Sequence, residues 1–254
     1  MSGLGGGASS GLRAVAGAAW GFRWTVERDA EARFLALARR LEALGAPAPI
    51  AELARRAASD EERHAAHCAR IAGELGAPVP DAGPLPPAPV APASLDEEDR
   101  VTYELVAACC VAETVSVAVL TALLPHARDP DLRAVLHELA TDEVSHARLG
   151  WAHLATAAAR GRTAFLGPLL PPMLAGSADD DLFDEGDPDH EDVALLPLGV
   201  LPHATKRELF LGALDEVVLP GLARAGVDTA AASAWLAARR AASGDAPAGP
   251  PARP

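Results

Sequence analysis

The sequence predicts an all-α protein built as a bundle of long helices. Alanine and leucine, both strong helix formers, supply much of a hydrophobic content of 50%. Aromatic residues make up only 4%, and strand-forming residues are sparse outside a few short runs. Glycine and proline divide the 254 residues into segments of helix length, which is enough chain for one sizeable domain with an extension.

The first two predicted helices form an antiparallel hairpin. We expect residues 1–18 to be a flexible N-terminus and the bundle to span residues 19–162. The first helix covers about 20–44 and ends at the sequence GAPAP, and the second covers about 50–75 and ends at GAP. Glycine and proline in these positions stop a helix and turn the chain back.

The next two predicted helices form a second hairpin, joined to the first by a long connector. Residues 76–94 are rich in proline and can run as an extended strap along the bundle. Ser94 and Glu97 fit a capping box that opens a third helix over about 95–124. A fourth helix covers about 130–160. Two hairpins joined by one long crossover predict a four-helix bundle.

The rest of the chain is predicted to extend this bundle. Residues 163–243 combine a segment rich in proline and acids with helices at about 204–225 and 228–242. We interpret the acidic run 179–192 as a solvated loop, because its spacing does not match a calcium-binding loop. Residues 244–254 are predicted to be a disordered tail.

Charge and cysteine content exclude several classes of function. The net charge of -13 argues against a nucleic-acid partner, which would require a basic surface. Cys68, Cys109 and Cys110 fit neither a disulfide framework nor a zinc site and are typical of a reducing compartment. The N-terminal sequence lacks the pattern of a signal peptide. We therefore expect a cytoplasmic protein with no nucleic-acid or membrane partner.

One carboxylate interrupts the most apolar part of the sequence. Residues 105–124 carry a single charge, Glu113. The run is long enough to cross a membrane, but a charge at its centre favours the innermost helix of a soluble bundle. Burying an unpaired carboxylate costs several kcal/mol, so we expect Glu113 to face positive charge.

Two copies of the motif E-x-x-H suggest where that charge lies. Glu61 and His64 are on the second helix, and Glu143 and His146 are on the fourth. Residues three apart share one face of a helix, so each pair can bind one metal ion or bridge two. The acids that precede the motifs, Asp60 and Asp142, are suited to accept the remaining N–H of a ligating histidine.

The two other helices bring carboxylates to the same height. Because both arms of a hairpin rise equally per residue, Glu113 lies level with Glu143, and Glu27 lies level with Glu61. Glu31 is one turn after Glu27 on the same face, and turn distance alone slightly prefers it. Glu31 is thus an alternative ligand or a base beside the metals, and a solvated face remains an alternative for both.

The motifs together resemble those of a known superfamily. One Glu from each of two helices and E-x-x-H from two others resemble the ligand set of di-iron and di-manganese carboxylate proteins. Residues 20–160 resemble the ferritin-like superfamily, and in particular bacterial ferritin-like domain proteins, through Glu27, Phe34 and the LGAP turn at 44–47. The segments AETVSVAV and DPDLRAVLHELATDEVSHARLGW are similar to that group too.

The resemblance implies a fold, a metal centre and a class of chemistry. It implies a ferritin-like four-helix bundle that holds two Fe ions, with Mn or a mixed Mn/Fe pair as alternatives. Two histidine ligands group the site with rubrerythrins, bacterioferritins and oxygenases, and D-E-x-R-H at 60–64 is similar to bacterial multicomponent monooxygenases. The implied metal ligands are Glu27, Glu61, His64, Glu113, Glu143 and His146. The predicted catalytic residues beside them are Glu31, Asp60 and Asp142.

We expect a non-haem di-iron oxidoreductase that activates O2 to oxidise a small organic substrate. It would need an external electron donor, and such bundles often pair as homodimers along an exposed helix face. An apolar lining is predicted from Val106, Cys110, Val117 and Leu120, with the C-terminal helices as a roof. The alternatives are a ferroxidase or peroxidase of rubrerythrin or bacterioferritin type and a non-catalytic bundle stabilised by metal.

Overall fold

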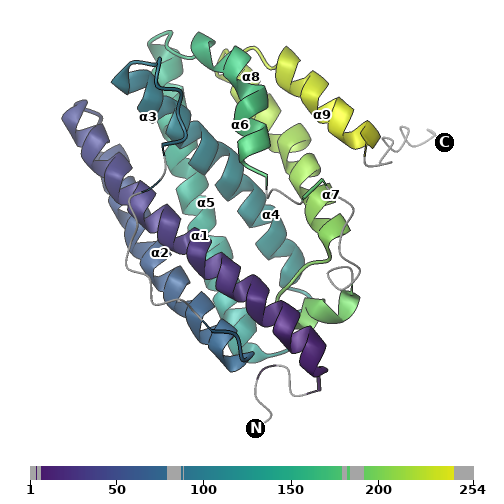
Figure 1. Cartoon of the computed structure of the whole chain (residues 1–254). Coiled ribbons are helices and arrows are strands. Elements are labelled where there is room, and N and C mark those ends of the chain that lie inside the picture. The colour runs from purple at the N-terminus through teal and green to yellow at the C-terminus, as the bar shows by residue number, and fades with distance from the viewer. Residues whose placement is uncertain are drawn as a thin grey trace, which may run out of the picture.

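The protein is described by a computed structural model that covers residues 4, 7–78, 87, 89–178, 182–183 and 192–242. Within these residues every regular element is a helix, which confirms the all-α prediction. The long helices α1 to α5 form the bundle, and shorter helices stand along one side of it (Figure 1). The predicted tail, most of the acidic run, and residues 79–86 and 88 of the proline-rich connector lie outside the described residues.

The first hairpin consists of α1 (Ser10–Ala43) and α2 (Ala48–Glu74). The start of α1 corrects the prediction, because residues 10–18 of the expected flexible N-terminus are helical. Ser9 caps this end by accepting a hydrogen bond from the Leu12 backbone N–H. Ala16 and Trp20 are then buried, so packing holds the first turns of α1 in place.

The third predicted helix is one continuous rod with an irregular centre. It comprises α3 (Glu97–Leu105), the π-helical segment η1 (Val106–Ala112) and α4 (Glu113–Leu123). The predicted Ser94 capping box is wrong, since Asp96 caps the helix by accepting from the Asp99 backbone N–H. The fourth helix, α5 (Pro130–Ala159), agrees with its predicted bounds.

The C-terminal elements pack beside α4 (Figure 1). Where one helix was predicted over 204–225, α7 and α8 flank a second π-helical segment, η5. In chain order the elements are η2 (Ala164–Leu169), α6 (Leu170–Gly176), η4 (Val193–Leu198), α7 (His203–Ala213), η5 (Leu214–Val218), α8 (Leu219–Arg224) and α9 (Ala230–Ala242).

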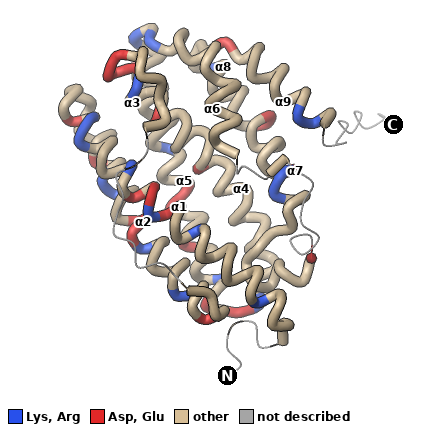
Figure 2. The backbone as a smooth tube through the Cα atoms, in the orientation of Figure 1, with Lys and Arg blue, Asp and Glu red and all other residues tan. Residues whose placement is uncertain are grey.

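The apolar rod lies inside this arrangement. By length and composition Glu97–Leu123 is the one helix of the described residues that can cross a membrane, a test that a core helix also passes. Charged residues concentrate on α1, α2 and α3, whereas α4 and α6 carry few (Figure 2). The rod packs against α5 on one side and α7 on the other, as expected for the inner helix of a bundle.

Candidate metal centre

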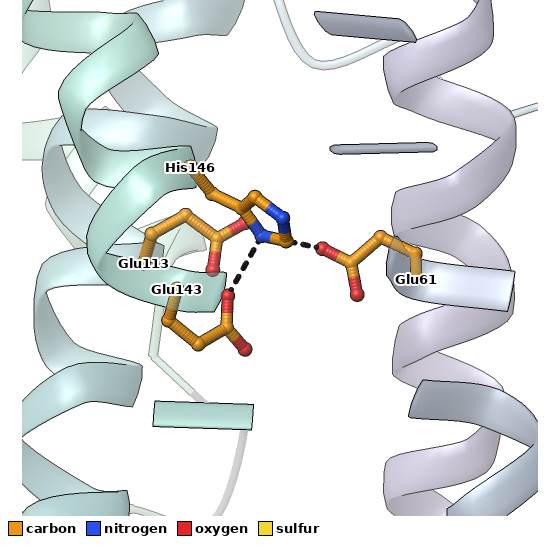
Figure 3. Close-up of side chains that lie close together, drawn as sticks. All are labelled: Glu61, Glu113, Glu143 and His146. Carbon is orange, nitrogen blue, oxygen red and sulfur yellow. Dashed lines mark hydrogen bonds and ion pairs between the residues drawn. The ribbon is translucent and has the colours of Figure 1, made fainter. Parts of the chain in front are cut away.

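Six ligand-type side chains from four helices meet in the middle of the bundle. Glu61 reaches from α2 toward Glu113, Glu143 and His146 on the opposite helices (Figure 3). All six side chains are buried, although every one of them is ionisable, namely Glu27, Glu61, His64, Glu113, Glu143 and His146. Carboxylates are almost never buried this deeply without a partner, so the cluster needs positive charge.

The donor atoms fall into two groups that share one residue. Glu61, Glu113, Glu143 and His146 each offer a ligand atom within 4.8 Å of the others. Glu27, Glu61 and His64 form the second group at the same limit. Glu61 belongs to both groups, and its two oxygens lie 3.1 Å from Nδ1 of His64 and 3.1 Å from Nδ1 of His146, respectively.

The two imidazoles are oriented by carboxylates from both E-x-x-H helices. Their Nδ1 atoms face the cluster, at 3.1 Å from Glu61 for His64 and at 3.0 Å from Glu143 for His146. Their Nε2 atoms face outward and pair crosswise, His64 with Asp142 at 3.2 Å and His146 with Asp60 at 3.3 Å. An Nε2–H donated to a carboxylate leaves the Nδ1 lone pair free for a metal.

The electrostatics of the cluster are those of a cation site. Burial, followed by the charges of Glu61 and Glu143, raises the pKa of Glu27 well above its usual value. Burial and then Glu143 do the same to the pKa of Glu113. Although burial opposes it, hydrogen bonds to Glu143 and Glu61 raise the pKa of His146 to about 11. Bound cations would stabilise every ionised carboxylate, and carboxylate with imidazole is a donor set that suits iron and manganese.

A comparison with protein-family models agrees with this donor set. The model of the rubrerythrin family matches residues 24–150, which is half of the chain. The chain belongs to the rubrerythrin family. It is thus a ferritin-like di-iron carboxylate protein, and the matched segment contains all six clustered residues. Searches of curated proteins and of solved structures gave no match.

The rubrerythrin domain brings only one of the two candidate acids of α1 into the cluster. Glu27 is 6% exposed and has a ligand atom beside Glu61 and His64. Glu31 forms an ion pair with Arg28 instead and lies outside both donor groups. The expectation that Glu31 stands beside the metals is therefore corrected. Glu31 lies on the same face of α1 as Glu27 but four residues, or about 6 Å, further along the helix axis, where Arg28 pairs with its carboxylate.

Two residues that support the cluster escaped the sequence analysis. Arg63 donates to Asp60 at 2.7 Å and to Asp142 at 2.9 Å, and so joins the two acids that contact the imidazoles. Its position within D-E-x-R-H was the available signal. Ser116 donates to Glu143 at 3.1 Å. It is three residues after Glu113, a spacing that places both on one helix face.

A cavity of about 380 Å³ adjoins the cluster and is bounded by Glu27, Glu61, Glu113 and Glu143. The predicted lining is wrong, since Val106, Cys110, Val117 and Leu120 do not border this cavity. On the rod the lining residues are Ala108, Ala112, Val115, Ser116, Val119 and Leu123. Val106 and Cys110 belong to the core shared with the C-terminal elements, so the cavity faces α1 instead.

Proposed function

We propose that this protein is a di-iron oxidoreductase that uses O2 to oxidise a small organic substrate held in the cavity. Glu27, Glu61, His64, Glu113, Glu143 and His146 would hold the two irons. The bound irons supply the redox chemistry with O2. The observation that carries the proposal is the cavity itself, because it joins four cluster carboxylates to a mostly apolar space.

The chain's own residues support such a reaction by position and by exclusion of water. Asp60 and Asp142 hold the imidazoles, and Ser116 holds one oxygen of Glu143. Val115 and Val119 line the wall next to the cluster and limit access of water to it. The oxidant is O2, the electrons come from the substrate and an external donor, and the oxygen that does not enter the product leaves as water.

The cavity also includes residues beyond the family domain. Ser177, Ala178, Leu182, Val200 and Leu201 close it on the side away from the bundle. A bundle that only oxidises iron or reduces peroxide has no need for such a wall. This feature favours an organic substrate.

A ferroxidase or peroxidase is the second candidate, and the family match favours it. In that function iron or peroxide is itself the substrate. It predicts oxidation of added Fe(II) in proportion to O2 consumed, with no organic product. Manganese, alone or paired with iron, is the alternative occupant of the same donor set.

The deciding experiment is anaerobic reconstitution with Fe(II), followed by optical spectroscopy on mixing with O2. We expect about two irons per chain and a transient absorbance change, as six ligands of this kind predict for paired irons. The double variant Glu113→Ala/His146→Ala should lose both signals. The matched control Asp131→Ala, an exposed acid of α5 outside both donor groups and the cavity, should keep them. Iron content that does not change in the double variant would contradict the proposal.

A further inference from the structure

The wall of the cavity that α1 contributes carries a guanidinium group close to the cluster. Arg23 is one turn before Glu27 and lines the same cavity. Two other cations line it, but Arg33 is bound to Asp29 at 2.9 Å and Lys206 has a partner of its own. Arg23 forms no hydrogen bond or ion pair with any residue that the structure describes.

Trp20 holds this guanidinium in position. The guanidinium carbon of Arg23 lies 5.0 Å from the centre of the Trp20 ring. Trp20 is 1% exposed, and its indole N–H donates to the Leu198 carbonyl at 2.8 Å, which fixes the plane of the ring. A guanidinium stacked on an aromatic face keeps the N–H donors at its edge available to a ligand.

Arg23 also acts electrostatically on Glu27, but at more than ion-pair distance. With or without a bound metal, therefore, no carboxylate of the described residues pairs directly with Arg23 at the edge of the cavity. Such a charge in a partly desolvated site favours an anionic ligand group.

The remainder of the cavity is suited to an apolar body. Phe34, Val119 and Leu123 line it from the bundle, and Leu201 and Phe210 line it from the C-terminal elements. A volume of about 380 Å³ is near the lower limit for ligand pockets, which span roughly 300 to 1,000 Å³. The ligand is therefore small, with one polar end and one apolar end.

We propose that the cavity binds a small aliphatic monocarboxylate, with its carboxylate on Arg23 and its alkyl part along α4 beside the cluster. The inference rests on the proposed function, since it identifies the substrate class of that site. A carboxylate matches the planar guanidinium with two parallel hydrogen bonds. A doubly charged group such as phosphate is disfavoured, because Asp29 borders the same space and most of the remaining lining is apolar.

The test is calorimetric titration of the full-length, metal-free protein with octanoate and with octan-1-ol, compared between two variants. Arg23→Gln removes the charge at the cavity. Arg39→Gln removes a charge from an exposed position of the same helix that does not line the cavity. We expect octanoate to bind at least about ten-fold more weakly to Arg23→Gln than to wild type. Arg39→Gln should bind it like wild type, and octan-1-ol should not distinguish the variants.

Several results would overturn this inference. One is equal octanoate affinity in wild type and Arg23→Gln. If the glutamine variant folds poorly, Arg23→Lys takes its place in the comparison, because it keeps the charge but not the planar guanidinium. Others are octan-1-ol binding as tightly as octanoate, inorganic phosphate competing with octanoate at similar concentration, or no octanoate binding. The octanoate titration needs no metal, so it is independent of the iron experiment. If octanoate does not bind but iron uptake and O2 reactivity are normal, only the substrate class is rejected. Normal octanoate binding without iron uptake rejects only the proposed function.

Discussion

At the scale of single residues, Glu113 shows why this sequence needs a metal. It is the one charge in the apolar run 105–124, and it is 8% exposed in the folded chain. Burial and the nearby charge of Glu143 raise its pKa, so the ionised form lowers the stability of the metal-free fold at neutral pH. Bound cations would reverse that effect, so the energetic cost of burying ionised Glu113 is coupled to the affinity for metal.

We expect Glu113→Gln to separate stability from metal binding. Without metal the variant should unfold at a temperature equal to or above that of wild type, because a neutral side chain costs less to bury. Its Fe(II) affinity should fall at least about ten-fold, since even outer partners of ligands have effects of that size. Thermal unfolding with and without Fe(II) measures both. Glu27→Gln should behave alike and Glu31→Gln like wild type, so a Glu31→Gln variant that loses iron would reject the assignment of Glu27.

A second residue-scale prediction concerns His153. Burial lowers the pKa of His153 to about 4, and its Nε2 is hydrogen-bonded to Thr102 at 3.0 Å. An unfolded histidine has a pKa near 6.5, so between about pH 6.5 and 4 the unfolded chain binds more protons than the folded one. The stability from neutral His153 is complete above that window and is lost as the pH falls through it.

Between pH 7 and pH 5, which covers about 1.5 pH units below the pKa of an unfolded histidine, we expect the unfolding free energy of the metal-free protein to fall by roughly 2 kcal/mol. Denaturant titrations at pH 7 and pH 5 measure it. His153→Gln, which keeps a polar group at this position, should show a smaller drop between the two pH values. His126→Gln, at an exposed position, should show the same drop as wild type. An unchanged drop in His153→Gln would show that other groups cause it.

At the scale of elements, the π-helical segment η1 and α5 fit together through one glycine. A Cβ on Gly150 would lie 2.5 Å from Cys109 Cβ and 3.0 Å from the Cys110 backbone nitrogen. The absence of a side chain lets α5 approach the wide turn of η1 directly before Glu113. A π-helical turn carries an extra residue, so it sets the direction in which the next turns of α4 point.

Gly150→Ala should therefore destabilise the protein by about 1–3 kcal/mol, because backbone and a packed Cβ must move. It should also weaken iron binding, since Glu113 follows η1 and His146 is one turn from Gly150. Gly73→Ala is the control. Gly73 is also helical, and an added Cβ there meets nothing within 4 Å. If Gly150→Ala and Gly73→Ala shift the denaturant midpoint by the same amount, this account of η1 is contradicted.

At the scale of the whole molecule, the C-terminal elements are joined to the bundle at Trp20. Its indole N–H donates to the Leu198 carbonyl, and the neighbouring Gly199 has φ 77°. A Cβ on Gly199 would lie 2.7 Å from the Trp20 ring, so this left-handed glycine permits both the turn and the contact. The joint closes one end of the cavity beside Arg23.

Replacing Trp20 with Phe should loosen this joint. The variant leaves the Leu198 carbonyl without its donor, and we expect a loss of about 1–3 kcal/mol. Hydrogen exchange should accelerate in residues 195–201 more than in α2. Trp24→Phe, where the ring makes no such hydrogen bond within the described chain, should leave exchange in 195–201 unchanged. Exchange that increases uniformly in Trp20→Phe would instead indicate a general loss of stability.

The sequence by itself determined the helical fold, the two hairpins and the set of ligand-type residues. Helix periodicity is local, and a rise of about 1.5 Å per residue is enough to place Glu27, Glu61, Glu113 and Glu143 at one height. For the same reason the bounds of α5 agreed with prediction. Helix starts were less predictable, because a capping residue or packing against distant residues sets them. Examples are the start of α1 at Ser10 and the cap of α3 at Asp96.

Only the tertiary structure decided how these side chains turn and what they meet. It separated Glu27 from Glu31 through the ion pair to Arg28, and it paired Asp60 and Asp142 with the histidines of the opposite helix. It also showed that the cavity lies on the α1 side of the rod and is not bordered by the residues predicted to line it. Height along a helix follows from residue number alone, whereas rotation about its axis and contacts between helices depend on π-helical turns, ion pairs and packing among residues distant in the chain.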